Sequence, residues 1–141
     1  MEDDWGIGVR RIRFFLTSLT DLSYVLMRVF FGLSFSFHGA QKLFGFFGGS
    51  KVEEPLMLVA GGIELVGGLA IALGIFTQLV SLIAAIEMLA AYFIAHSPRG
   101  LWPIENKGEL ALLYFFVFFV ILSRGAGRWS LDEFFSKDTN G

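Results

Sequence analysis

The chain has 141 residues, of which 55% are hydrophobic and only 17% are charged, whereas ordinary soluble proteins carry roughly 25% charged residues. A net charge of −2 argues against a nucleic-acid partner, and the length supports a single domain. Because cysteine is absent, disulfides, thiol catalysis and cysteine-ligated metal sites are excluded, and we expect no metal site. This composition indicates an integral membrane protein.

Four apolar runs define the expected architecture, at residues 22–44, 56–76, 79–96 and 107–122. Their lengths lie near the roughly 17–25 residues that a helix needs to cross a bilayer, the fourth being marginal. No period-2 alternation supports a barrel, so we expect helices. A tight connection at Thr77-Gln78 joins the second and third runs. The expected fold is an all-α, four-helix transmembrane bundle forming one domain over residues 1–141.

Short interfacial helices are expected at both termini. Before the first span, apolar residues share one helical face beside three arginines, a pattern typical of a helix lying on an anionic lipid surface. After the fourth span, Ser130 to Glu133 form a capping box that opens a second short helix. The residues before the first span are Trp5, Ile12, Phe15 and Leu19, with Arg10, Arg11 and Arg13.

Lysine and arginine are unequally distributed between the two sides of the expected bundle. The side with both termini has six, and the opposite side has three: Arg10, Arg11, Arg13, Arg124, Arg128 and Lys137 against Lys51, Arg99 and Lys107. Since positive charge favours the cytoplasmic side, we expect both termini in the cytoplasm.

Ionisable residues inside the spans are the main functional signal, because such groups are costly in hydrocarbon and face a bundle interior or cavity. Arg28, His38 and Lys42 fall within an arc of about 80° on one helix. The expected depths place one polar cavity in the outer half of the membrane, with Arg28 as a separate inner group. The residues expected in that cavity are His38, Lys42, Glu64, Glu87, His96, Asn106 and Glu109.

Glu64 and Glu87 are each flanked at helical spacing by small residues, which favours close helix approach and places both carboxylates inside the bundle. A buried carboxylate is either neutral or paired with Lys42 or Arg28. Two readings stay open. In one, at least one carboxylate lines a ligand site; in the other, Glu64–Lys42 and Glu87–Arg28 are fixed structural pairs that bind nothing.

Three segments carry a family resemblance: His38-Gly39-Ala40-Gln41-Lys42-Leu43 at the end of the first span, Gly61-Gly62-Ile63-Glu64 in the second, and Gly125-Ala126-Gly127-Arg128-Trp129-Ser130-Leu131-Asp132 after the fourth. In this order, over residues 25–132, they resemble the DoxX family of small bacterial four-helix membrane proteins. The resemblance implies a bacterial or archaeal cytoplasmic membrane. His38, Gln41 and Lys42 match the first motif of that family and Glu64 matches the second, so the resemblance implies that they belong to one site. Arg128, Ser130 and Asp132 match the terminal motif, which we expect to be a structural clamp on the cytoplasmic side.

The same resemblance implies association with redox work. Relatives include the membrane subunit of an archaeal thiosulfate:quinone oxidoreductase, proteins linked to resistance against quinones and catechols, and a membrane complex that handles oxidative stress. A quinone requires an apolar slot with donors at its carbonyls and groups that exchange protons. We expect His38 and Lys42 to donate and Glu64 or Glu87 to exchange protons. The chain supplies no intrinsic cofactor, so electrons come from a redox partner.

The alternatives belong to other functional classes. In one alternative the protein is a non-enzymatic assembly factor, scaffold or small-molecule binder, which acts as a homo-oligomer or with a partner. The polar cluster then has a structural role. A b-type haem held by His38 and His96 is disfavoured because the chain has only two histidines, one of them at a span edge. Transport requires dimerisation and broken helices that the sequence does not indicate.

Overall fold

The structure is a computed structural model that describes residues 4–138, with side chains described from residue 8 onward. Helices and short loops make up this part of the chain, with no strand within it. The elements in order are α1 (Asp4–Phe44), α2 (Pro55–Gly62), η1 (Ile63–Gly67), α3 (Gly68–Leu73), α4 (Thr77–Ala91), η2 (Tyr92–His96), η3 (Ser97–Arg99), α5 (Pro103–Asn106), α6 (Glu109–Arg124) and α7 (Leu131–Asp138).

Three helical stretches are long and apolar enough to cross a membrane: Gly8–Phe44, Pro55–Leu73 and Thr77–Arg99. They confirm the expectation of an all-α membrane helical bundle. The fourth expected span corresponds to α6, which has 16 residues and extends from Glu109 to Arg124. At 1.5 Å per residue α6 is about 24 Å long, shorter than the roughly 30 Å of a hydrocarbon core.

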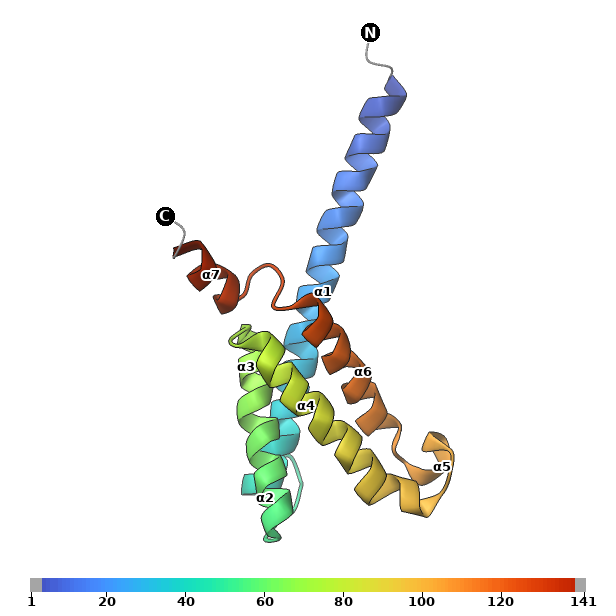
Figure 1. Ribbon diagram of the computed structural model, residues 1–141, viewed down its shortest axis with the longest axis vertical. Coiled ribbons are helices and arrows are strands. Elements are labelled where there is room, and N and C mark those ends of the chain that lie inside the picture. Colours follow the sequence, from blue (N-terminus) through green and yellow to red (C-terminus); the bar gives the residue numbers. More distant parts are fainter. Residues whose placement is uncertain (1–3, 139–141) are drawn as a thin grey trace.

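The first helix differs from the expectation of a separate N-terminal interfacial helix. α1 continues without a break for 41 residues, and its first half projects beyond the rest of the molecule (Figure 1). The sequence explains this, because no glycine or proline interrupts residues 9–31. Trp5, expected on the apolar face of that segment, has a side chain outside the described residues. The short C-terminal helix is present as α7.

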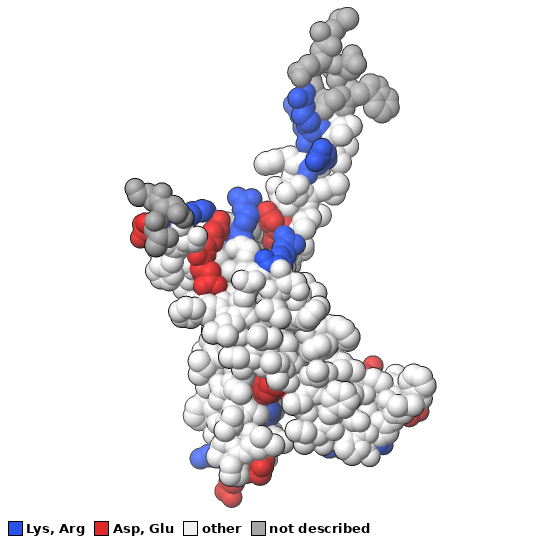
Figure 2. All heavy atoms as spheres, in the orientation of Figure 1, with Lys and Arg blue, Asp and Glu red and all other residues white. Residues whose placement is uncertain are grey.

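The long helices form two arms. α1 packs along α2, η1 and α3 in the first arm, and α4 packs against α6 in the second. The arms meet near the connection between α3 and α4, close to α7, and diverge toward the opposite end (Figure 1). We call the meeting point the terminal end, and the opposite end, which carries residues 45–54 and 97–108, the loop end. Figure 2 shows a largely uncharged flank between these ends.

Glycines set the close spacing inside the first arm. A Cβ atom at Gly39 would lie 2.3 Å from the backbone nitrogen of Leu65, and one at Gly68 would lie 2.5 Å from the carbonyl oxygen of Gly32. Since both contacts are with backbone atoms, no side chain can move aside to make room. The small residues beside Glu64 therefore bring α1 and the second span together, as the sequence predicts.

An apolar core joins the two arms. Phe35 of α1, Ile71 of α3 and Ala84 of α4 are each at most 1% exposed. α6 contributes a buried stripe of Ala111, Tyr114, Phe118 and Ile121. Many large apolar side chains elsewhere are exposed, as expected of a surface that faces lipid.

The connection between the second and third spans lies three residues earlier than expected. The turn consists of Gly74, Ile75 and Phe76, and Thr77 already begins α4. Gly74 and Phe76 both adopt left-handed backbone conformations, with φ of 74° and 46°. A left-handed phenylalanine is unusual, and the hydrogen bonds that hold it come from a distant part of the chain, as shown below.

Candidate functional site at the loop end

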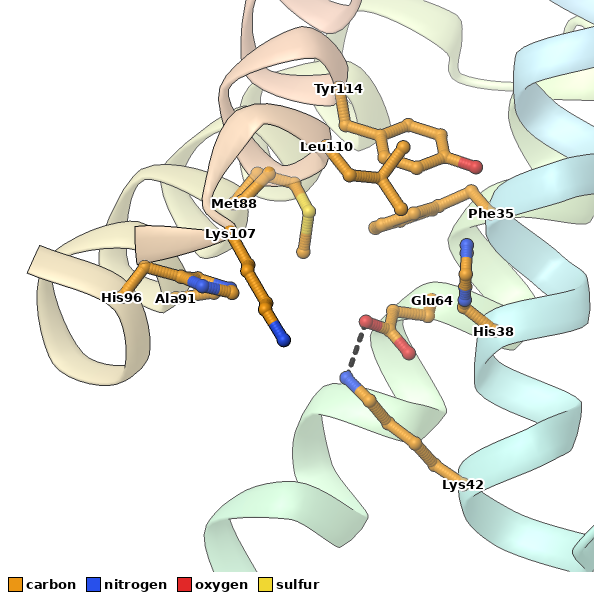
Figure 3. A pocket seen from close by; sticks show the side chains of 11 residues that line it. Phe35, His38, Lys42, Glu64, Met88, Ala91, His96, Lys107, Leu110 and Tyr114 are labelled. Atoms are coloured by element: carbon orange, nitrogen blue, oxygen red, sulfur yellow. Dashed lines mark hydrogen bonds and ion pairs between the residues drawn. The ribbon is translucent and has the colours of Figure 1, made fainter. Parts of the chain in front are cut away.

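A cavity of about 230 Å³ lies between the diverging arms (Figure 3). Its polar lining consists of His38 and Lys42 from α1, Glu64 from η1, His96 from η2 and Lys107, which precedes α6. The apolar lining comes from Phe35, Met88, Ala91, Leu110, Ala111 and Tyr114. The structure therefore brings together four of the residues expected at the site: His38, Lys42, Glu64 and His96.

Glu64 is the most deeply buried charged group of this cavity, at 3% exposed. It lies in a π-helical turn, a local widening of the helix that is frequent at functional sites. Lys42 Nζ donates to Glu64 Oε1 over 2.5 Å, as Figure 3 shows. The expected Glu64–Lys42 pair is thus present. Glu64 Oε2, however, is buried and has no hydrogen-bond donor among the residues that the structure describes, so the pair leaves one strong acceptor unused.

His38 lies one helical turn before Lys42 and is half-buried. Its ring meets that of Tyr114 edge-to-face, with 5.8 Å between the ring centroids. This contact places an imidazole between the apolar part of the cavity and the carboxylate, an arrangement visible in Figure 3.

Asn106 organises the loop that closes the second arm. It is 1% exposed, its Nδ2 donates to the carbonyl of Gly100 over 2.9 Å, and its Oδ1 accepts from Gly108 N over 2.8 Å. The carbonyl of Asn106 lies 3.2 Å from Nδ1 of His96. The intervening Lys107 has a left-handed backbone, with φ of 60°, and its ammonium extends toward the cavity (Figure 3). Asn106 therefore positions a histidine and a lysine rather than contacting the cavity itself.

Glu87 lies on a second cavity. This cavity has a volume of about 290 Å³, is bordered by α2, α4 and η2, and shares Lys42, Ala91 and His96 with the first. Both carboxylate oxygens of Glu87 are buried, and neither has a hydrogen-bond partner in the described part of the chain. The alternative reading that pairs Glu87 with Arg28 is wrong, because the described hydrogen bonds of Arg28 go to two backbone carbonyls near the terminal end. The single polar cavity expected from the sequence is therefore two adjoining cavities.

The structure places Gln41 and Glu109 outside both cavities. Gln41 borders a shallow surface depression with Phe37 and packs over Gly49, where an added Cβ would meet its side chain. Glu109 is exposed on another face of α6, near Pro103. The sequence analysis expected Glu109 and His96 at a similar depth in the membrane. Depth alone does not show toward which side of α6 the side chain of Glu109 points.

The terminal end holds the other expected ionic residues in a clamp. Arg28 is 1% exposed and donates to the carbonyls of Ile71 over 3.1 Å and Trp129 over 3.0 Å. Its Nε atom has no acceptor. Arg28 thus links α1 to the end of α3 and to the segment before α7.

Asp132 caps α4 from a remote position in the sequence. One carboxylate oxygen accepts from Phe76 N over 2.8 Å, and the other accepts from the backbone and hydroxyl of Thr77 over 2.9 and 2.8 Å. Partial burial acts to raise the pKa of Asp132, but the hydrogen bonds from Thr77 and Phe76, with the charge of Arg28, outweigh it and hold the pKa below its usual value. These bonds explain the left-handed Phe76.

Arg128 pairs with a residue that the sequence analysis did not single out. Asp21 accepts from Arg124 over 3.1 Å and from Arg128 over 3.4 Å. Tyr24, one turn further along α1, donates its hydroxyl to the carbonyl of Gly125. These contacts attach the end of α6 to α1.

Two cavity residues with polar side-chain groups, Tyr114 and Lys107, were missed by the sequence analysis. Tyr114 belongs to the buried stripe of α6, whose spacing of i, i+3, i+7 and i+10 is visible in the sequence and marks the inward face. Lys107 was counted as a loop charge, and its direction depends on the left-handed turn that Asn106 holds. Position 107 is not a glycine, so the sequence did not indicate a left-handed backbone there.

Comparison with known proteins agrees with this architecture. The DoxX family model matches residues 23–97. An uncharacterized protein of Haemophilus influenzae is 40% identical over 119 residues, which cover 79% of this chain and 89% of that protein. The "Putative oxidoreductase CatD" of Bacillus subtilis is 30% identical over 123 residues, covering 83% and 90%. No solved structure matches the chain at comparable significance. The chain belongs to the DoxX family.

Proposed function

We propose that this membrane protein is a quinone-interacting redox subunit whose quinone head group binds in the loop-end cavity. The observation that carries the proposal is the buried Glu64–Lys42 pair, which has an unused acceptor and faces an aromatic and aliphatic slot. The relative named as an oxidoreductase supports the redox class.

The chemistry of the lining suits a flat ring with polar atoms at its edge. Phe35, Met88 and Tyr114 offer apolar and aromatic contacts, while Lys42 and Lys107 offer donors for a carbonyl oxygen. The volume of about 230 Å³ lies below the roughly 300–1,000 Å³ of drug-sized sites. A single-ring head group fits this space better than a large cofactor such as haem does.

The reaction in this proposal is the reduction of a quinone to a quinol, or its reverse. Reduction adds two electrons and two protons to the carbonyl oxygens. Glu64 and His38 exchange the protons, and Lys42 donates a hydrogen bond to the oxygen that becomes negatively charged. The electrons come from a partner protein that carries a redox cofactor, because the chain contributes no cysteine-ligated centre.

An orientation is part of the proposal. The lysine and arginine distribution favours an arrangement with both termini in the cytoplasm. In this proposal the membrane is the cytoplasmic membrane of a bacterial or archaeal cell, and the loop end lies at its outer face. Protons exchanged at Glu64 then come from the outer side. A cysteine introduced at Lys51, labelled by a membrane-impermeant maleimide in whole cells, tests this arrangement; labelling only after cell lysis contradicts it.

The direct test is extraction of quinone from purified protein. Detergent-solubilised wild type is extracted with organic solvent and the quinone is quantified by mass spectrometry, beside E64Q and H38A. We expect wild type to retain quinone and both variants to lose most of it. E109Q is the matched control, because Glu109 is exposed outside the cavity, and it retains quinone at the wild-type amount.

Two results contradict the proposal. One is an equal amount of quinone in wild type, E64Q and H38A, and the other is no quinone in any of them even after incubation with decylubiquinone and with menadione. Either result favours the non-enzymatic module, in which the Glu64–Lys42 pair fixes the packing of α1 against the second span.

A further inference from the structure

The second cavity contains a buried carboxylate, Glu87, whose hydrogen-bonding capacity is not satisfied by any of the described residues. Both oxygens of Glu87 are shielded from solvent and have no hydrogen-bond partner within the described residues. Leaving a carboxylate in this condition costs free energy unless it is neutral or meets a donor. Lys42 also lines this cavity, but its ammonium group is paired with Glu64 at 2.5 Å.

The remainder of the cavity is almost entirely apolar. Leu56, Met57 and Ala60 line it from α2, and Ile94 lines it from η2. Small alanines on α4 and α2 create the space, about 290 Å³ in volume. Leu56 and Ile94 are 54% and 62% exposed on the outer surface of the bundle. In a membrane this surface faces lipid, so the cavity is accessible from the hydrocarbon side.

The two cavities adjoin, but each has a carboxylate of its own. Glu87 does not line the first cavity, and Glu64 does not line the second. Lys42 and His96 stand at their common border. Because Lys42 is neutralised by Glu64, the second cavity retains the unpaired negative charge of Glu87 when that carboxylate is ionised.

We propose that the second cavity binds an amphiphilic organic cation, whose protonated amine donates to the free oxygens of Glu87 while its alkyl body lies among Leu56, Met57 and Ile94. A cationic head satisfies both acceptors through charge-assisted hydrogen bonds. An apolar body matches the remaining lining and the hydrocarbon-facing entrance. Methionine adapts to ligands of differing shape, so the site accepts a class of amines rather than one of them.

The test uses n-hexylamine as the cationic probe and 1-hexanol as its neutral counterpart of equal chain length. Each is titrated calorimetrically into protein in lipid nanodiscs, and the signal from empty nanodiscs is subtracted. We expect saturable binding of the amine to wild type and no saturable binding of the alcohol. E87Q preserves the side-chain volume and weakens amine binding by about ten- to hundredfold, as expected for loss of a charged hydrogen-bond partner.

Two further variants guard against effects on folding. A60L fills the second cavity without altering any charge, and we expect it to abolish amine binding although Glu87 is still present. E109Q removes a carboxylate outside the cavity and leaves amine binding unchanged. The proposal is overturned if E87Q binds the amine as tightly as wild type does, or if hexanol binds as well as hexylamine.

The same variants separate this proposal from the quinone proposal. E87Q and A60L lose the amine and retain extractable quinone, whereas E64Q and H38A lose quinone. If wild type does not bind the amine but retains quinone, only the proposed cation site is contradicted. If wild type binds the amine but retains no quinone, only the proposed function is contradicted.

Discussion

At the terminal end, Arg28 donates to the carbonyls of Ile71 and Trp129, and Asp132 accepts three hydrogen bonds from the start of α4. At the loop end, Glu64 has one unused oxygen and Glu87 has two. Both ends therefore contain buried charge, but only at the terminal end is most of that charge used to hold the chain together. Polar groups satisfied within the protein stabilise its fold, whereas the unsatisfied oxygens of Glu64 and Glu87 are the basis of the two binding sites proposed above.

Replacing Arg28 tests the structural side of this comparison and has the largest expected effect. R28M removes two charge-assisted hydrogen bonds from a site that is 1% exposed. We expect the free energy of unfolding to fall by about 3 kcal/mol, measured by denaturant titration in detergent micelles. R99M, at an exposed arginine, is the control and changes stability by less than about 0.5 kcal/mol. Equal losses in both variants would refute the clamp.

Replacing Asp132 gives an intermediate effect that depends on pH. D132A removes the cap of α4 and lowers the free energy of unfolding by about 2 kcal/mol at pH 7. The pKa of Asp132 in the folded protein lies below its ordinary value of 3.8. Its contribution is therefore complete above about pH 4 and is lost as the pH falls through the lowered pKa.

The measurement for Asp132 is the melting temperature of wild type and D132A between pH 7 and pH 3. We expect the gap between them to narrow only below about pH 4. The control E53A alters an exposed carboxylate at the loop end and shows no gap. A gap that widens on acidification contradicts the cap.

Replacing the Glu64–Lys42 pair as a whole sharpens the other side of the comparison. The double variant K42M/E64L exchanges the pair for apolar residues of similar size, and we expect the free energy of unfolding to change by less than about 1 kcal/mol in either direction. Quinone retention is lost in the same preparation. A loss of stability as large as that of R28M would show that the loop-end pair is also part of the structural framework.

Much of the fold follows from the sequence because hydrophobic runs and small-residue spacing act locally. The apolar runs predicted the helices, and the glycines beside Glu64 predicted the close approach of α1. The separation of the ionic residues into a clamp at the terminal end and a polar region at the loop end also follows from their expected depths in the spans. Arg28 and Glu64 accordingly lie near the ends where the sequence places them.

The details that failed depend on helix rotation and on long-range hydrogen bonds. Glu109 is at the expected level, yet it faces away from the cavities because the rotation of α6 is set by its buried stripe. The turn at Gly74 to Phe76 was misplaced because Asp132 holds it from 55 or more residues away. Lys107 extends toward the cavity only because Asn106 fixes its backbone. None of these features is indicated by a pattern in the neighbouring sequence.

α1 connects the two ends mechanically. Arg28 and Lys42 lie on the same uninterrupted helix, fourteen residues or about 21 Å apart. The helix is tied to the rest of the chain at one of these residues and borders both cavities at the other. The hydrogen bonds of Arg28 to Ile71 and Trp129 fix the rotation of α1 about its own axis, and they thereby fix the face of the helix from which Lys42 extends to Glu64.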